Sequence, residues 1–328
     1  MPNHALIESM RRARFMQGVA GVGLASLLGK NSTSAAFAQT VPTVTIAAPA
    51  NDSAAEYLYA SDLGFFTNAG LNVQAQVIAN AGTISSAVAS GAIGIGGLTV
   101  PIIALAYDRN IPLRIVAPGA VYTSASPTTG LIVLNGSPIH QAAELNGKTV
   151  GVRDINNLNT VATRVWMAQN GADAASLKFI EITEALAVEA MKQGRIDAAC
   201  ISNPSFSNLT RGDARVLATV YDNIAKYFLV AVYFTTENYA RAHPDIIKKL
   251  AAVISSTAKW ANENHAQSAK ILEKYSGSPV PPDIPRVHYA EQLRAVDVQP
   301  VLDALYKYGA IKKSIRAAEL FAPGAPWQ

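Results

Sequence analysis

The residues best suited to bind a ligand lie at places where apolar segments of the chain end, and most of them are small and polar. They are Asn51, Ser53, Gly82, Thr83, Leu98 and Thr99 in the first half, and Arg153, Asn156, Asn157, Asn159, Ser202 and Asn203 in the second half. Each is expected at a strand end or a helix start, where backbone N–H groups stabilise an anion by about 0.3 to 1 kcal/mol. Several such starts around one cleft would hold a carboxylate or sulfonate with few full charges.

Arg153 is the one cation well placed to add a bidentate hydrogen bond to such an anion. A surface position paired with Asp154 is an equally open interpretation. The asparagine and threonine side chains share this ambiguity, because a residue that caps a helix needs no ligand to explain it. Tyr57, Tyr122 and Tyr227 are candidate walls for the apolar body of a ligand.

The chain offers little for catalysis or for a cofactor. Gly147-Lys148-Thr149 resembles the end of a phosphate-binding loop, but position 142 is alanine and the lysine leads into a strand, so the required context is missing. The histidines are scattered with no pair at i, i+4, and Cys200, the single cysteine, lies in a predicted buried strand. We expect no metal and no cofactor. If the protein were an enzyme, Glu184 and Arg153 would be the best available pair.

The positions of these groups follow from a repeat. Residues 80–101 (NAGTISSAVASGAIGIGGLTVP) align without a gap on residues 183–204 (TEALAVEAMKQGRIDAACISNP), which places Gly91 on Gly194 and Pro101 on Pro204. Each copy reads as a capped helix, a glycine turn, a short apolar strand and a polar loop stopped by proline. Ligands of open α/β sheets lie beyond the carboxyl ends of the strands. Two copies therefore predict two lobes that face one ligand, unless the likeness of the two αβ units is accidental.

The remaining pattern extends this α/β organisation. Further strands are predicted at residues 44–49, 71–78, 113–117, 130–134, 149–153, 178–182, 216–220 and 229–235, and the chain from residue 244 onward reads as helical, with helices over 244–275 and 287–305 joined by the stiff PVPPDIP segment. We predict that lobe 1 comprises residues 39–127 plus 235–328, including the C-terminal helices. Lobe 2 then comprises residues 128–234.

The N-terminal segment has the organisation of an export signal. Its first 38 residues hold three more basic than acidic side chains, out of a total net charge of +4. An apolar run of about 14 residues is too short to span a bilayer, which needs about 20, and Ala36-Phe37-Ala38 predicts cleavage after Ala38. No cysteine for a lipid anchor is near this site. The rest of the chain is almost neutral, which argues against a nucleic-acid partner.

Six short motifs in order make the chain resemble periplasmic solute-binding proteins of ABC importers, in the nitrate, sulfonate and taurine group. They are Asp62-Leu63-Gly64-Phe65-Phe66 to Gly70-Leu71-Asn72-Val73, Ala89-Ser90-Gly91 to Gly96, Leu145-Asn146-Gly147-Lys148-Thr149-Val150-Gly151-Val152, Gly194-Arg195-Ile196-Asp197-Ala198-Ala199, His243-Pro244, and Tyr308-Gly309 to Lys312-Lys313. Gly94 and Asn203-Pro204 depart from the pattern, where the group often has aspartate and Glu-Pro. Both departures lie near the expected ligand and leave its identity open.

The resemblance implies a two-lobed type II periplasmic binding fold, in which each lobe is a mainly parallel sheet flanked by helices and the ligand lies between the lobes. It further implies a monomer in the periplasm that closes on a small organic anion and delivers it to an inner-membrane permease with a separate ATPase. Thiamine-pyrimidine synthases share the fold but use a cysteine-rich element, which a chain with one cysteine cannot supply. A pyrimidine-forming or prephenate-type enzyme, or a ligand-sensing protein, is the alternative.

Overall fold

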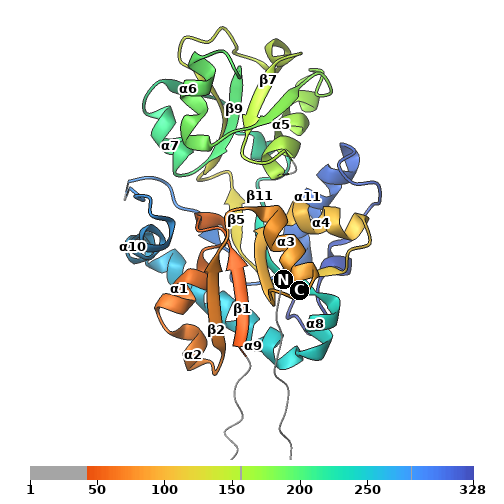
Figure 1. The fold of residues 1–328 in the computed structure, drawn as a ribbon. Helices are drawn as coiled ribbons and strands as arrows, with labels where there is room; N and C mark the ends of the chain where they lie inside the picture. Colours follow the sequence, from red (N-terminus) through yellow and green to blue (C-terminus); the bar gives the residue numbers. More distant parts are fainter. Residues whose placement is uncertain (1–42, 156, 282) are drawn as a thin grey trace, which may run out of the picture. The chain divides into compact units, whose positions relative to one another are not determined.

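The computed structural model describes residues 43–155, 157–281 and 283–328 (Figure 1). The predicted export signal and its cleavage site therefore lie outside the described residues, as does Asn156. The description below concerns the compact unit from Val41 to Gln328. No helix among its described residues is long and apolar enough to cross a membrane.

The described chain forms two five-stranded sheets with the same internal order. The first sheet has the order β2-β1-β3-β12-β4, with β1 at Thr43–Ala48, β2 at Asn72–Val77, β3 at Ile95–Thr99, β4 at Leu113–Pro118 and β12 at Ala231–Thr236. The second has the order β10-β6-β9-β7-β8, with β6 at Thr129–Leu134, β7 at Thr149–Val152, β8 at Lys178–Glu181, β9 at Ala198–Ser202 and β10 at Ala214–Ala218. Read from β8, the second order repeats the first.

Both sheets are mixed, with one strand running against the others. β12 is antiparallel to β3 and β4, and β6 is antiparallel to β9 and β10, whereas β1 pairs in parallel with β2 and β3, and β7 with β8 and β9. The reversed strand in each sheet is the one that enters it from the rest of the chain: β6 is the first strand of the second sheet, and β12 returns the chain to the first. The sheets are therefore mainly parallel, as expected.

A three-stranded antiparallel sheet carries the chain between the two larger sheets. Its order is β11-β5-β13, with β5 at Ala120–Thr123, β11 at Tyr227–Leu229 and β13 at His288–Tyr289. β5 leads out of the first sheet and β11 leads back. The sequence pattern predicted a helix from residue 287, which is wrong, because His288 and Tyr289 pair with Val121 and Ala120. The following helix begins only at Ala295.

Helices cover the sheets (Figure 1). They are α1 Glu56–Asp62, α2 Phe65–Asn68, α3 Ala81–Ala89, α4 Val100–Asp108, α5 Leu158–Gln169, α6 Ala187–Lys192, α7 Ser205–Thr210, α8 Glu237–Ala242, α9 Pro244–Glu263, α10 His265–Ser276 and α11 Ala295–Lys307. Short 3-10 helices occur at η1 Asp52–Ala54, η2 Ala142–Leu145, η3 Glu184–Leu186, η4 Val220–Asn223 and η5 Ala317–Leu320. The predicted helix over 244–275 is divided at Asn264 into α9 and α10.

The sequence repeat occupies equivalent places in the two sheets. β3 lies between β1 and the reversed strand β12, and β9 lies between β7 and the reversed strand β6. Gly91 and Gly194 both have positive φ, 80° and 67°, which confirms the predicted glycine turns. The helix starts differ: the side chain of Asn80 caps α3, whereas Thr183 makes no cap hydrogen bond and its segment opens with the short η3.

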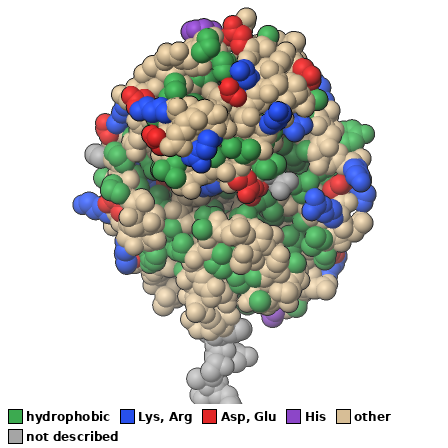
Figure 2. Space-filling view, turned by 45° about the horizontal axis from the view of Figure 1, so that its top comes forward, with side chains coloured by type: hydrophobic (Ala, Val, Ile, Leu, Met, Phe, Trp, Pro, Cys, Tyr) green, Lys and Arg blue, Asp and Glu red, His purple; other side chains and the backbone are tan. Residues whose placement is uncertain are grey.

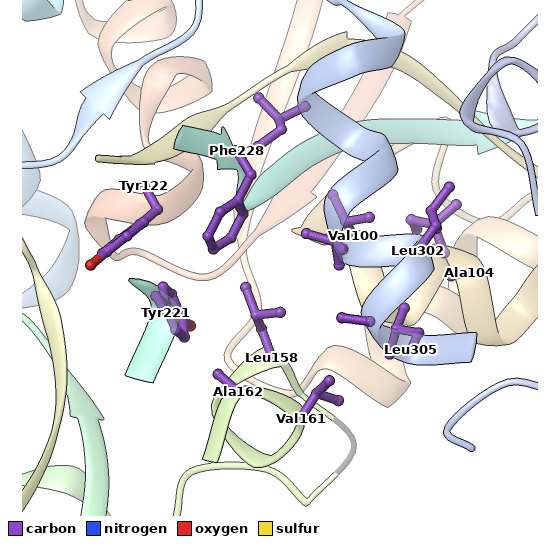
Figure 3. Close-up of a cluster of buried hydrophobic side chains, with 14 of the residues drawn as sticks. Val100, Ala104, Tyr122, Leu158, Val161, Ala162, Tyr221, Phe228, Leu302 and Leu305 are labelled. Atoms are coloured by element: carbon purple, nitrogen blue, oxygen red, sulfur yellow. The ribbon is translucent and has the colours of Figure 1, made fainter. Parts of the chain in front are cut away.

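Buried apolar side chains form one core for the first sheet, one for the second, and a larger cluster shared by both. In the shared cluster, Leu158 and Val161 of α5 lie toward Val100 of α4 and toward Leu302 and Leu305 of α11, and Ala162 lies on the side of Tyr221 (Figure 3). Tyr122, Tyr221 and Phe228, from the segments that connect the sheets, lie in the same cluster. α5, which begins beside the predicted ligand-binding residues Arg153 and Asn157, is therefore held in place by apolar packing on its buried face.

Candidate functional site

Two adjoining cavities lie at the carboxyl ends of strands from both large sheets. We call them cavity A, with a volume of about 40 Å³, and cavity B, with a volume of about 150 Å³. Ser53, Thr99, Arg153 and Asn157 line both cavities. Since the two cavities share these walls, we treat them as one candidate site. This is the location that the rule for open α/β sheets predicts.

The first sheet contributes the polar residues that follow β1 and end β3. Asn51 caps η1, because its Oδ1 accepts a hydrogen bond from the Ser53 N–H at 3.1 Å. Asn51 and Leu98 line cavity B. Thr99 ends β3, and its buried Oγ1 has no hydrogen-bond partner among the described residues. An unpaired buried hydroxyl costs free energy, so this oxygen is available to a ligand at the shared wall of the two cavities.

The second sheet contributes the start of α5. Asn157 Oδ1 accepts hydrogen bonds from the N–H groups of Asn159 at 2.9 Å and Thr160 at 3.4 Å. Asn159 is committed to the interior, since its amide donates to the Cys200 carbonyl at 3.1 Å and accepts from the Tyr221 hydroxyl at 2.5 Å. The positive end of the α5 dipole therefore lies at the cavities, where it favours a negative ligand.

Arg153 follows β7 and brings a guanidinium to both cavities. It is an exposed residue, and it makes no hydrogen bond or ion pair with any residue that the structure describes. The carboxyl group of Glu184 is partly buried near it and accepts the Ser202 N–H at 3.1 Å. Burial raises the pKa of Glu184, while the Arg153 charge and the Ser202 hydrogen bond oppose the rise. Glu184 is not among the residues that line either cavity.

Several predicted ligand residues lie elsewhere. Tyr57 is fully buried and its hydroxyl is within hydrogen-bonding distance of the Ala48 carbonyl, at 2.8 Å. Tyr122 is also buried, and its hydroxyl donates to Asp222 at 2.8 Å. Both are core side chains and line neither cavity. Aromatic residues near a cleft are as suited to a core as to a ligand wall, and sequence alone does not separate the two uses.

The predicted residues at the start of α3 lie at the edge of the site. Gly82 lines a neighbouring groove between α3 and α4. The Thr83 hydroxyl bonds to Asn80 Oδ1 at 3.1 Å, which also accepts the Thr83 N–H at 2.8 Å. Asn80, rather than Thr83, lines cavity B. Thr83 thus takes part in the helix cap, the second of the two roles that its position allowed.

Sequence reasoning missed an ion pair in the wall of cavity A. Asp52 lines this cavity and receives Arg286 Nε at 3.1 and 2.9 Å and Arg286 Nη2 at 2.5 Å. Both side chains are about 95% buried, and Arg286 Nη2 also donates to the Tyr59 hydroxyl at 3.1 Å. The partners are 234 positions apart, so no local pattern could have paired them. Within the described residues, no group of His, Cys, Asp and Glu could hold a metal ion.

Comparison with known proteins identifies the class first by its fold. The periplasmic aliphatic sulphonate binding protein SsuA from Escherichia coli is 19% identical, with a TM-score of 0.69 over 87% of this chain and 93% of that chain. The alkanesulfonate-binding protein SsuA from Xanthomonas axonopodis pv. citri, bound to MOPS, is 18% identical, with a TM-score of 0.69 over 86% of this chain and 98% of that chain. The periplasmic nitrate-binding protein NrtA from Synechocystis PCC 6803 is 17% identical, with a TM-score of 0.70 over 85% of this chain and 84% of that chain. The chain therefore has the periplasmic binding protein fold.

The family follows from the sequence itself. The model of the NMT1/THI5-like family matches residues 51–268, about two thirds of the chain, so the protein belongs to this family. No protein of curated function matches the chain. The resemblance drawn from the six motifs is thereby confirmed at the level of family and fold.

Proposed function

We propose that this protein is the extracytoplasmic solute-binding component of an ABC importer and that it captures a small organic anion of the sulfonate, carboxylate or aromatic acid type. The observation that carries the proposal is the convergence of Arg153 and the start of α5 on the two cavities. A guanidinium and a helix start are both suited to an anion. Thr99 would add a hydroxyl.

Release to a membrane permease and location in the periplasm are parts of the same proposal. Their support is the export pattern of the first 38 residues and the sulfonate- and nitrate-binding proteins that share the fold. A monomer suffices, because both walls of the site come from one chain. On the face shown in Figure 2, basic and acidic side chains are interspersed, without a continuous basic stripe of the kind that nucleic acid requires.

We further propose that the protein does not catalyse a reaction. Glu184, the acid that the sequence analysis paired with Arg153, accepts the Ser202 N–H and stands outside the cavity linings. A general acid or base must come within hydrogen-bonding reach of the reacting atom. An enzyme on this scaffold, or a sensor that uses closure as a signal, remains the alternative. Turnover of a pyrimidine precursor or prephenate that is lost in Glu184→Gln would favour the enzyme.

The test is ligand-dependent stabilisation, since a ligand that binds only the folded state raises the melting temperature. Alkanesulfonates, aromatic acids and pyrimidines are screened against the parent, Arg153→Gln and Arg195→Gln. Arg195 is exposed and lines neither cavity, so its variant controls for the lost charge. We expect an anion to stabilise the parent and the control. Arg153→Gln should weaken its binding about 10- to 100-fold, the worth of one charged hydrogen bond. Equal binding by Arg153→Gln would exclude this site.

A further inference from the structure

Residues 283–287, between α10 and β13, contact both large sheets of the protein. We call them the strap. On the side of the first sheet, Ile284 is 4% exposed and belongs to that sheet's core cluster. Arg286 forms the buried ion pair with Asp52, and β13 then pairs with β5. These contacts anchor the strap to the first sheet and to the segment that leaves it.

The strap also holds the second sheet at the end of β9 and at α7. Asn203 Nδ2 donates to the Pro285 carbonyl at 2.7 Å. Asn203 Oδ1 accepts the N–H and the hydroxyl of Ser207 at 3.0 and 2.8 Å, which fixes the amide in this orientation. Arg211 adds an ion pair with Asp283 Oδ2 at 2.9 Å and a hydrogen bond to the Asp283 carbonyl at 3.1 Å.

The strap is part of the wall of cavity A. Val287 and Asp52 line that cavity from the strap side, and Asn203 lines it from the second sheet. The strap also lies beyond residue 268, where the family match ends. Any movement that separates the second sheet from the first must break the Asn203 and Arg211 contacts and withdraw one wall of cavity A.

We propose that the strap is a latch that holds the two sheets in the conformation with small cavities before any ligand is bound. β5 and β11 connect the sheets covalently and the shared apolar cluster packs between them, and the strap adds polar contacts that can open. The Asn203 amide, predicted from sequence to bind ligand, is on this proposal a latch contact, since its oxygen and one N–H are bound within the protein. Ligand access then competes with the latch contacts.

The test measures the distance between the sheets in protein freed of small molecules by dialysis against urea and refolding. Spin labels are placed on Thr67→Cys in α2 and Gln193→Cys after α6, in a Cys200→Ala background. Both labelled positions are exposed. The latch variant Asn203→Asp/Asp283→Asn keeps the acceptor for Ser207, removes the donor to Pro285 and breaks the Arg211 ion pair. We expect its distances to shift to larger values.

The control variant Asn135→Asp/Asp213→Asn makes the same changes inside the second sheet's own unit. Asn135 donates to the Gly212 carbonyl at 2.9 Å and Lys192 pairs with Asp213 at 2.5 Å. Its distance distribution should match the parent's. Exchange of the exposed pair, Arg211→Asp/Asp283→Arg, should restore the distances that Arg211→Asp alone increases. A latch variant with the parent's distribution would overturn the latch. Because no ligand is present, failure to find a ligand leaves this result unaffected.

Discussion

At the scale of single residues, Glu56 makes stability depend on pH. Its side chain is fully buried at the start of α1, Oε2 accepts the Tyr233 hydroxyl at 3.0 Å, and Oε1 has no partner among the described residues. Burial raises the pKa of Glu56 from 4.5 to about 8, against the hydrogen bonds that lower it. The folded protein therefore keeps a proton that the unfolded chain releases.

The sign of the effect follows from this proton. Between pH 4.5 and about 8 the folded state binds more protons at Glu56 than the unfolded state, so the free energy of unfolding falls as pH rises. Glutamine is neutral at every pH, so we predict that the free energy of unfolding of Glu56→Gln lacks this dependence on pH. At pH 9 it should exceed that of the parent by several kcal/mol, since one pKa unit corresponds to about 1.4 kcal/mol. Urea unfolding at pH 5, 7 and 9 measures it. The exposed Glu291→Gln is the control, and parallel curves for parent and Glu56→Gln would refute the prediction.

Residue types at strand ends could be predicted from the sequence, but their partners could not. Ser53, Thr99 and Arg153 were placed by the rule that ligands lie beyond carboxyl ends of strands, and all three line both cavities. The Asp52–Arg286 pair joins segments that are distant in sequence, and only the tertiary fold brings them together. Tyr57 and Tyr122 illustrate the same limit, because burial is decided by packing that their local pattern does not contain.

At the scale of elements, the start of α5 can be separated into its structural and its ligand-binding roles. Asn157→Ala removes the cap and should lower the free energy of unfolding by about 1 kcal/mol. Asn157→Asp keeps the acceptor and places a negative charge at the positive end of the helix dipole, so it should preserve stability. The same charge should repel an anion and pair with Arg153. We predict that Asn157→Asp weakens binding of the best anion from the screen without loss of stability.

Urea unfolding and titration of that anion, followed by the melting temperature, test both statements. Thr236→Ala is the matched control, because Thr236 caps α8 through the Tyr239 N–H at 3.1 Å and lines neither cavity. It should lose stability and bind as the parent does. If Asn157→Asp binds the anion as tightly as the parent, the start of α5 does not face the ligand.

Elements with strong local signals were predicted from the sequence, and those that depend on distant partners were not. The glycine turns at Gly91 and Gly194 and the buried strands β3 and β9 follow from local pattern. β13 is two residues long and exists only because β5 offers its edge. The apolar periodicity of the following helix extends back over these two residues, so the sequence pattern predicted a helix where the structure has a strand.

At the scale of the whole molecule, the two sheets share a buried cluster, and this predicts that they unfold together. Leu302 of α11 is 1% exposed and lies with Leu158 and Val161 of α5 in the cluster that joins both sheets (Figure 3). A lobe that unfolded alone would leave half of this cluster in water, at a cost of roughly 25 cal/mol per Å² of apolar surface. That cost favours a single cooperative transition.

Tryptophans report on the two sides separately. Trp166 lies in α5, beside the second sheet, and Trp260 lies in α9, against the core of the first. In each variant that keeps only one of them, with phenylalanine at the other and at Trp327, tryptophan fluorescence and far-UV circular dichroism should report the same urea midpoint. Leu302→Ala should lower the free energy of unfolding by about 2 to 5 kcal/mol. Both urea midpoints should therefore fall by the same amount. Tyr306→Ala, exposed on the same helix, should leave both unchanged. Separate midpoints for the two reporters would show that the shared cluster does not couple the sheets, and the strap would then be their main non-covalent connection.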